Sequence, residues 1–149
     1  MQTKQLKLKI VTPERLVLEE MADQVTLPTA EGEITVLPDH IPLIAKLAAG
    51  DVISVRGGLP APLAVAGGFI EVKGGEMGVT EVAVLADFAE HVSEISDEKI
   101  AEAKRKAEDL KKQVANKEVV DFEHFAAELE RSLTRVKIAD KWRTRKYRK

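Results

Sequence analysis

The side chains that most often carry out chemistry are scattered along this chain. The three histidines, His40, His91 and His124, lie far apart and there is no cysteine, which argues against a zinc site. No serine or threonine sits in a nucleophile-elbow motif, and neither glycine-rich phosphate-binding motif, GxxxxGK(S/T) or GxGxxG, occurs. Carboxylates are plentiful in the C-terminal part, but they alternate with lysines as exposed i,i+4 partners do. We therefore expect no catalytic residue and no metal site.

Charge is the next candidate for function, and it is unevenly distributed. Residues 1–89 contain 7 basic and 12 acidic side chains, whereas residues 90–149 contain 16 basic and 13 acidic ones. The basic excess lies at the end of the chain, opposed only by Asp140: Lys137, Lys141, Arg143, Arg145, Lys146, Arg148 and Lys149. Such a segment favours an acidic partner surface, although charge alone fits a solvated terminus equally well.

The elements that must position these side chains are of two kinds. All nine glycines and six prolines precede residue 79, so turns are concentrated there and long helices are favoured afterwards. Residues 6–10 alternate apolar and charged side chains, which is typical of a half-buried strand. Similar short runs follow, separated by turn signals such as Gly57-Gly58 and Gly67-Gly68. Many short strands at this spacing indicate a β-sandwich or a barrel.

From Ser96 onward the apolar spacing becomes helical. Ser96 suits the N-cap of a first helix, and Asp121 suits that of a second. The expected apolar stripes are Ile100, Ala103, Ala107, Leu110 and Val114 on the first helix, and Phe122, Phe125, Ala126, Leu129, Leu133 and Val136 on the second. The short link between them predicts an antiparallel hairpin. Its alanine-rich seam buries little area, so the hairpin could be a switch or a permanent stalk.

These patterns predict an α+β chain, mainly β and then α. No apolar run approaches the ~20 residues that a membrane span needs, and the N-terminus shows no signal or transit segment. We expect a cytoplasmic chain that reaches a membrane only through a partner.

Three stretches are distinctive in composition and order. Residues 31–43 read EGEITVLPDHIPL, residues 64–72 read AVAGGFIEV, and residues 82–90 read VAVLADFAE. In order and spacing they resemble the epsilon subunit of bacterial F-type ATP synthases, over about residues 5–140. The resemblance implies an N-terminal β-sandwich of about ten strands, residues 1–87, followed by an antiparallel two-helix hairpin with a basic tail, residues 88–149.

The resemblance also implies a role in the central rotor stalk. The sandwich would pack on the γ subunit and on the polar loops of the membrane c-ring, and would couple proton-driven rotation to ATP synthesis. Glu31, Glu33 and His40 are the residues it assigns to this contact. A local explanation stays open, because Pro38 and Pro42 alone account for the turn around His40. The chain would be a non-catalytic, peripheral subunit at the cytoplasmic face of the bacterial inner membrane.

The hairpin of the resembling family also inhibits ATP hydrolysis. When it extends, its basic second helix reaches acidic segments of the α/β head. The resemblance assigns this contact to Arg131, Arg135, Lys137 and Lys141. We therefore expect residues 120–149 to inhibit hydrolysis.

In some relatives the compact hairpin binds ATP, through an Ile/Leu-Asp-x-x-Arg-Ala motif and two arginines on the second helix. Here Ser96 replaces the motif's aspartate and Lys99 its arginine, while Glu90, Arg131 and Arg135 match. Lysine cannot reproduce the bidentate geometry of arginine. We expect weak or absent ATP binding and no other cofactor.

Two segments depart from the resembling family. Residues 74–81 form a longer connection than usual, and the basic segment 141–149 runs past the usual end. One alternative is a sandwich module with a basic tail for nucleic acid, although the tail has few stacking aromatics and the sandwich is acidic. The others are a small hydrolase, for which no nucleophile–base set is present, and the mitochondrial relative of the same subunit.

Overall fold

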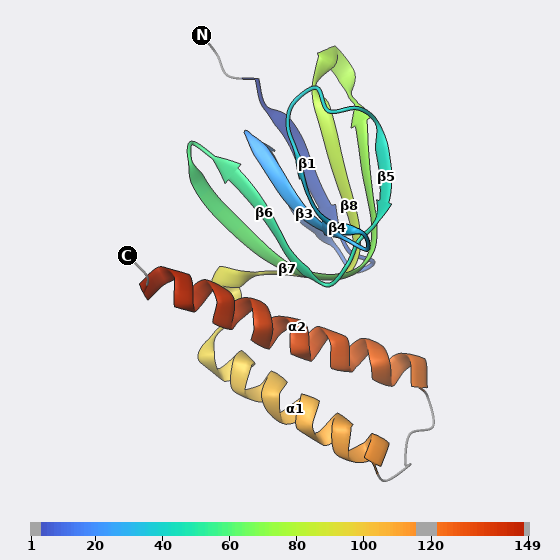
Figure 1. The fold of residues 1–149 in the computed structure, drawn as a ribbon, viewed down its shortest axis with the longest axis vertical. Helices are drawn as coiled ribbons and strands as arrows, with labels where there is room; N and C mark the ends of the chain where they lie inside the picture. The colour runs from blue at the N-terminus through green and yellow to red at the C-terminus, as the bar shows by residue number, and fades with distance from the viewer. Residues whose placement is uncertain (1–3, 116–121, 148–149) are drawn as a thin grey trace. The chain divides into compact units, whose positions relative to one another are not determined.

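The computed structural model describes residues 4–115 and 122–147, and the chain divides into two compact units, residues 1–90 and 91–149. The first unit is built from strands and the second from helices (Figure 1). The α+β class, with β before α, is therefore confirmed. The division falls after Glu90, close to the boundary at residue 87 that the sequence suggested.

The β unit contains eight strands among its described residues, rather than about ten. They are β1 (Leu6–Val11), β2 (Leu16–Ala22), β3 (Gln24–Thr29), β4 (Gly32–Val36), β5 (Leu43–Lys46), β6 (Gly50–Arg56), β7 (Leu59–Gly74) and β8 (Thr80–His91). A short 3₁₀ turn, η1 (Glu76–Gly78), lies between β7 and β8. The strand order is β2-β1-β8-β7-β6-β3-β4, and β5 pairs with β7.

Long β7 holds the two halves of this sheet together. Its first part pairs antiparallel with β6, with Val52 opposite Leu63, and its last part pairs with β5, with Ala45 opposite Ile70. Parallel pairing of β1 with β8 adds the other half of the sheet. Because the sheet folds over on itself, its two halves enclose one apolar core (Figure 1).

Alternation along the strands produces this core. Leu6, Leu8 and Ile10 of β1 are fully buried, while Lys7 and Lys9 between them point to the other face. Side chains from the other strands complete the core, including Val25, Leu27, Val36, Val52, Leu63, Val65, Ile70, Val72, Val82 and Val84. Burying each large aliphatic side chain stabilises the unit by roughly 1.5–3 kcal/mol.

The Gly67-Gly68 pair is not the turn that the sequence predicted, and this accounts for part of the lower strand count. Both glycines lie inside β7, with φ angles of 69° and 112°, so the runs on either side form one strand of 16 residues. A Cβ on Gly68 would lie 1.8 Å from the carbonyl oxygen of Leu85 on β8. Glycine is therefore needed here because both residues have a positive φ and because β8 approaches Gly68 closely.

The helical unit begins with a 3₁₀ turn, η2 (Val92–Glu94), followed by α1 (Asp97–Ala115) and α2 (Phe122–Tyr147). Ser96 caps α1 as expected, because its hydroxyl accepts the backbone N–H of Lys99 at 3.2 Å. The described part of the predicted stripe is also confirmed, since Ile100, Ala103, Ala107 and Leu110 are buried. The expected cap Asp121 and the side chains of Val114 and Phe122 lie outside the described residues.

The predicted stripe of α2 is partly wrong. Phe125 is buried, but Leu133 is 42% exposed, and the small side chain of Ser132 is buried instead. Ser132 and Ala103 line one hollow between the helices, so small residues meet there. The seam thus follows Phe125, Ser132 and Ala139, each seven residues after the last, and Leu133 falls outside it.

No helix among the described residues is long and apolar enough to span a membrane.

Candidate functional site

Within residues 4–115 and 122–147, no three histidine, aspartate or glutamate side chains are placed to hold a metal ion together. Three surfaces of the described residues are considered below, and the site residues expected from sequence lie on or near the first and the third of them. Two surfaces belong to the β unit and one to the helical unit.

The first surface is the turn between β4 and β5, which contains His40. The His40 N–H donates to the Leu37 carbonyl at 3.1 Å, and ring atom Nδ1 lies 2.7 Å from the Ile41 carbonyl. Because a carbonyl only accepts, Nδ1 carries the proton in this contact, which leaves Nε2 for a partner. Leu37 and Ile41, whose carbonyls meet His40, have side chains that are 52% and 74% exposed. The turn thus combines a hydrogen-bonding ring with apolar surface.

Asp39 fixes this turn to the rest of the β unit. Its backbone has a φ of 67°, in the left-handed region that few residues other than glycine adopt. Its N–H donates to Thr80 Oγ1 at 2.7 Å, and its carboxylate pairs with Lys4 Nζ at 2.7 Å. The bond to buried Thr80 joins the turn to the first residue of β8, and the exposed pair with Lys4 adds little to it.

Glu31 and Glu33 lie elsewhere on the β unit. Glu31 is in the turn between β3 and β4, where its N–H donates to Thr29 Oγ1, and it borders a hollow of about 270 Å³ with Ile44 and Lys46. Glu33 is exposed on β4, opposite Pro28. Glu31 and His40 are at opposite ends of β4, roughly 13 Å or more apart at ~3.3 Å per residue. The structure therefore does not bring all three residues into one cluster.

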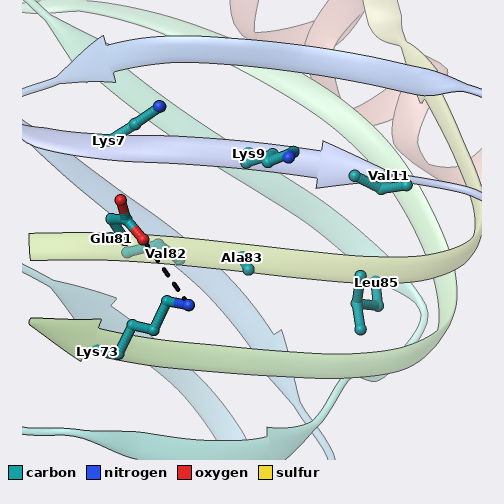
Figure 2. Close-up of a pocket in the computed structure, with 8 residues that line it drawn as sticks. All are labelled: Lys7, Lys9, Val11, Lys73, Glu81, Val82, Ala83 and Leu85. Atoms are coloured by element: carbon teal, nitrogen blue, oxygen red, sulfur yellow. Dashed lines mark ion pairs between the residues drawn. The ribbon is translucent and has the colours of Figure 1, made fainter. Parts of the chain in front are cut away.

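The second surface, on the outer face of β1, β7 and β8, was not found from sequence. Figure 2 shows Lys7, Lys73 and Glu81 at one end of this face and the apolar side chains of Val11 and Leu85 at the other, with Lys9 between them. They line a shallow hollow of about 260 Å³, together with Glu81, Val82 and Ala83. The alternation along each strand could have predicted which residues share this outer face, because every second residue of β1 and of β8 lines the hollow.

Ion pairs organise this face. Lys7 Nζ lies 2.9 Å from Glu19 Oε1, and this hydrogen bond raises the pKa of Lys7 and lowers the pKa of Glu19. Lys73 lies between Glu71, at 3.8 Å, and Glu81, at 3.9 Å. Such exposed pairs contribute little stability, roughly 0–1 kcal/mol each, but they set the charge pattern that a partner meets.

The third surface is the groove between α1 and α2. A hollow of about 220 Å³ is lined by Lys99, Lys106, Arg135 and Ser132, with Ala103 and Glu102. It brings together two of the expected nucleotide-site residues, Lys99 and Arg135, with Lys106 and the acidic Glu102 beside them. Arg131 is exposed one turn before Arg135.

The other two residues of the expected nucleotide set have different surroundings. The Ser96 hydroxyl is engaged in capping α1. Glu90 is buried at the end of β8, in the β unit. The structure therefore brings Lys99 and Arg135 into one hollow and gives Ser96 a structural role.

The remaining basic residues of α2 are spread along the helix. Arg131 and Lys137 are exposed, whereas Arg135 and Lys141 are half-buried. Lys141 Nζ lies 5.9 Å from the ring centre of Trp142, within reach of a cation–π contact. The charges that could meet an acidic partner thus lie along much of α2.

Ion pairs join the two helices within their described residues, one at the start of α1 and one at its middle. Arg143 pairs with Asp97 in the first turn of α1, and Lys106 Nζ lies 3.1 Å from Glu128 Oε1. Sequence reasoning counted Arg143 only as part of the basic tail and missed this pairing. Both pairs are largely exposed, so we expect them to hold the hairpin closed only weakly.

Comparison with known proteins relates these surfaces to a family. Residues 5–92 match the family model of the β-sandwich domain of the ATP synthase delta/epsilon chain. The chain is 40% identical over 135 residues to the ATP synthase epsilon chain of Nitratidesulfovibrio vulgaris, which covers 91% of this chain and 96% of that one. The chain belongs to the ATP synthase epsilon family. Another epsilon chain, from Dehalococcoides mccartyi, is 41% identical over 140 residues and covers 93% of this chain and 94% of that one.

The epsilon-family likeness extends to solved structures. A chain of the Euglena gracilis mitochondrial ATP synthase, in a structure of OSCP, F1 and the c-ring, matches with a TM-score of 0.61 and 23% identity. The match covers 96% of this chain and 82% of that one. At this identity it supports the fold alone. The alternative of a nucleic-acid-binding module finds no support among these epsilon-family matches.

Proposed function

We propose that the chain couples rotation to ATP synthesis in the central stalk of a bacterial ATP synthase, and restrains ATP hydrolysis, without catalytic activity of its own. The observation that carries this proposal is that the likeness to epsilon chains extends over both units, because it covers 96% of the N. vulgaris chain. The partners are the γ subunit, the c-ring and the α and β subunits. The chain is then peripheral, at the cytoplasmic face of the inner membrane.

The β unit is the coupling module in this proposal. It transmits torque only if its contact surfaces are rigid, and the turn of His40 is held by its bonds to Thr80 and Lys4. His40 and Ile41 contact the c-ring, and Glu31 and Glu33 contribute on the side of β4. A merely local role for His40 predicts instead that its replacement leaves coupling unchanged.

The helical unit inhibits ATP hydrolysis in this proposal. Arg131, Arg135, Lys137 and Lys141 lie along α2, and an extended hairpin presents them to acidic segments of the α/β head. Single exposed ion pairs contribute ~0.2–1 kcal/mol, so four or more acting together supply a few kcal/mol. The seam contains small residues such as Ala103 and Ser132 beside the larger Phe125, so we expect opening of the hairpin to cost a few kcal/mol.

The test is the rate of ATP hydrolysis by a bacterial α/β/γ core complex with the full chain or with a form that ends at Glu90. We expect both forms to bind and only the full chain to slow hydrolysis. Changing the four basic residues to alanine in the full chain should remove most of the inhibition, and more salt should weaken it. Unchanged inhibition after these substitutions would contradict the inhibitory role of the helical unit. Failure of both forms to bind the core complex would contradict the proposed role in the central stalk.

We also propose that the isolated chain binds ATP weakly or not at all. Lys99 and Arg135 bring positive charge to the groove, whereas Lys106 pairs with Glu128 and Glu102 adds a negative charge. A lysine also stands where relatives use a bidentate arginine, and Ser96 is engaged in capping α1. Titration calorimetry with Mg-ATP should show no micromolar site. Micromolar affinity would refute this proposal and would make the groove a nucleotide sensor.

A further inference from the structure

The last turns of α2 lie against the start of the helical unit. Arg143 pairs with Asp97 in the first turn of α1, and α2 continues past this pair to Tyr147. The Thr144 hydroxyl donates to the Asp140 carbonyl at 2.8 Å, which is the i−4 bond of an intact helix. Charge alone left this basic segment equally consistent with a solvated terminus, whereas the structure makes Arg143 part of the hairpin.

The register of the two helices places these turns beyond the start of α1. Lys106 is paired with Glu128, and Asp97 with Arg143. From the first pair to the second, α1 advances nine residues, about 13 Å, and α2 advances fifteen, about 22 Å, at ~1.5 Å per residue. The Arg143 side chain therefore reaches back to Asp97. In agreement with this register, α2 contacts η2, the turn that precedes α1 (Figure 1).

This contact involves the segment that attaches α1 to the β unit. β8 ends at His91 and α1 begins at Asp97, so η2 and the two residues after it form the whole connection. The Ile95 N–H donates to the Val92 carbonyl at 3.1 Å, which closes the turn. Movement of the helical unit relative to the β unit requires rotation within this connection. The end of α2 is thus in contact with the segment that must move.

Asp97 gives the end of α2 an acidic partner within the same chain. Arg143 lies in the C-terminal part of α2 and Asp97 in the first turn of α1, so each charge also suits the dipole of its own helix. In the proposed function, basic side chains of α2 meet acidic segments of the α/β head. Asp97 offers the same chemistry, a carboxylate. The closed hairpin and the head therefore compete for the basic end of α2.

We propose that the pair of Asp97 and Arg143, with the turns of α2 that contact η2, is a clasp that keeps the hairpin closed and so limits inhibition of ATP hydrolysis. This inference rests on the proposed function, which assigns inhibition to the extended hairpin. An exposed ion pair shifts an equilibrium by up to about fivefold. A contact of this strength changes how often the hairpin opens without preventing it, which suits regulation.

The first measurement is ATP hydrolysis by the bacterial α/β/γ core complex with saturating full chain. Asp97→Asn breaks the clasp and leaves every basic side chain of α2 in place. We expect the ratio of inhibited to active complexes to rise by about two- to fivefold. Glu98→Gln is the matched control, because Glu98 is exposed in the same helical turn and makes no ion pair within the described residues. It should inhibit as the unchanged chain does.

Hydrogen exchange in the full chain tests the clasp without the ATP synthase. Asp97→Asn and Arg143→Gln should each speed exchange of the amides in the second turn of α1 by about two- to fivefold. The double variant should be no faster than the faster single variant, because both substitutions remove one contact. Matching circular dichroism spectra show that the variants fold.

The outcomes separate this inference from the proposed function. Additive effects on exchange, or no effect, overturn the clasp whatever the hydrolysis rates are. Coupled exchange, with Asp97→Asn inhibiting no more than Glu98→Gln, overturns its regulatory role and leaves the inhibitory function intact. A full chain that does not slow hydrolysis overturns the proposed inhibition and the regulatory role with it, and exchange then still decides whether the clasp forms.

Discussion

Individual residues decide how the β unit closes, and Gly68 is the clearest case. Two adjacent glycines are a common turn signal, so the sequence predicted a turn at Gly67-Gly68. In the structure the residues before the glycines pair with β6 and those after them pair with β5, and the glycines allow β8 to approach. The alternation of β1 could be predicted from local spacing. The role of Gly68 could not, because it depends on Leu85, which is distant in sequence.

Gly68→Ala should destabilise the β unit. The new Cβ would meet the Leu85 carbonyl, and the φ of 112° is unfavourable for alanine. We expect a loss of about 2 kcal/mol or more in the free energy of unfolding, measured by urea denaturation followed by circular dichroism. Gly74→Ala is the matched control, because the Cβ that alanine would add there meets no atom within 4 Å and the φ of Gly74 is not positive. Equal stability of the two variants would contradict the structure.

Asp23 should make the stability of the β unit depend on pH. Its carboxylate accepts the Gly57 N–H at 2.7 Å and the Gln5 side-chain amide at 3.1 Å, and the bond from Gly57 is the main cause that lowers the pKa of Asp23. Since the folded pKa lies below the unfolded value of about 3.9, this stabilisation is present above that pH and disappears as pH falls through the folded pKa.

Asp23→Asn is therefore expected to unfold more easily than the unchanged chain at pH 7, with a difference that shrinks towards pH 3. Urea denaturation of both proteins at several pH values measures this. A difference that stays constant with pH would mean that the charge of Asp23 does not contribute.

At the scale of elements, the two helices differ in how well sequence could predict them. The cap and stripe of α1 follow from Ser96 and its regular apolar spacing. On α2, Leu133 and Ser132 are adjacent in sequence. Sequence reasoning placed Leu133 in the seam because it is the apolar residue of the two. The structure places Ser132 there because it faces the small side chain of Ala103. The burial of Ser132 depends on residues of α1, so it could not be predicted from the sequence of α2 alone.

The seam of α2 can be tested by paired substitutions. Phe125→Ala should weaken the hairpin by about 3 kcal/mol, because Phe125 is only 6% exposed, whereas Leu133→Ala should change it by less than about 1 kcal/mol. Hydrogen exchange of the α1 and α2 amides in the full chain reports the difference. If Leu133→Ala accelerates exchange as much as Phe125→Ala, the seam runs through Leu133.

The candidate sites show a similar limit at the scale of elements. The turn of His40 could be predicted from its prolines and from the family motif. Its bonds to Thr80 and Lys4, and hence its rigidity, could not, because those partners lie in distant parts of the sequence. The hollow of Figure 2 was missed for the same reason, since β1 and β8 are paired by tertiary folding.

At the scale of the whole molecule, we propose that the two units divide coupling and inhibition between them. A rigid β unit with an apolar core suits the transmission of torque. A hairpin whose seam mixes small with large residues, and whose helices are joined by partly exposed ion pairs, suits a part that opens for a few kcal/mol. The contrast in glycine, proline and charge content already separates these two kinds of element in the sequence.

The most direct test compares ATP synthesis and ATP hydrolysis by the complete ATP synthase in sealed vesicles, with the full chain or with a form ending at Glu90. We predict that the shortened chain still supports proton-driven ATP synthesis, because the β unit couples rotation to synthesis. We also predict that ATP hydrolysis becomes faster, because the inhibitory helical unit is missing. Loss of synthesis with the shortened chain, or hydrolysis that stays equally slow, would contradict this division between the units.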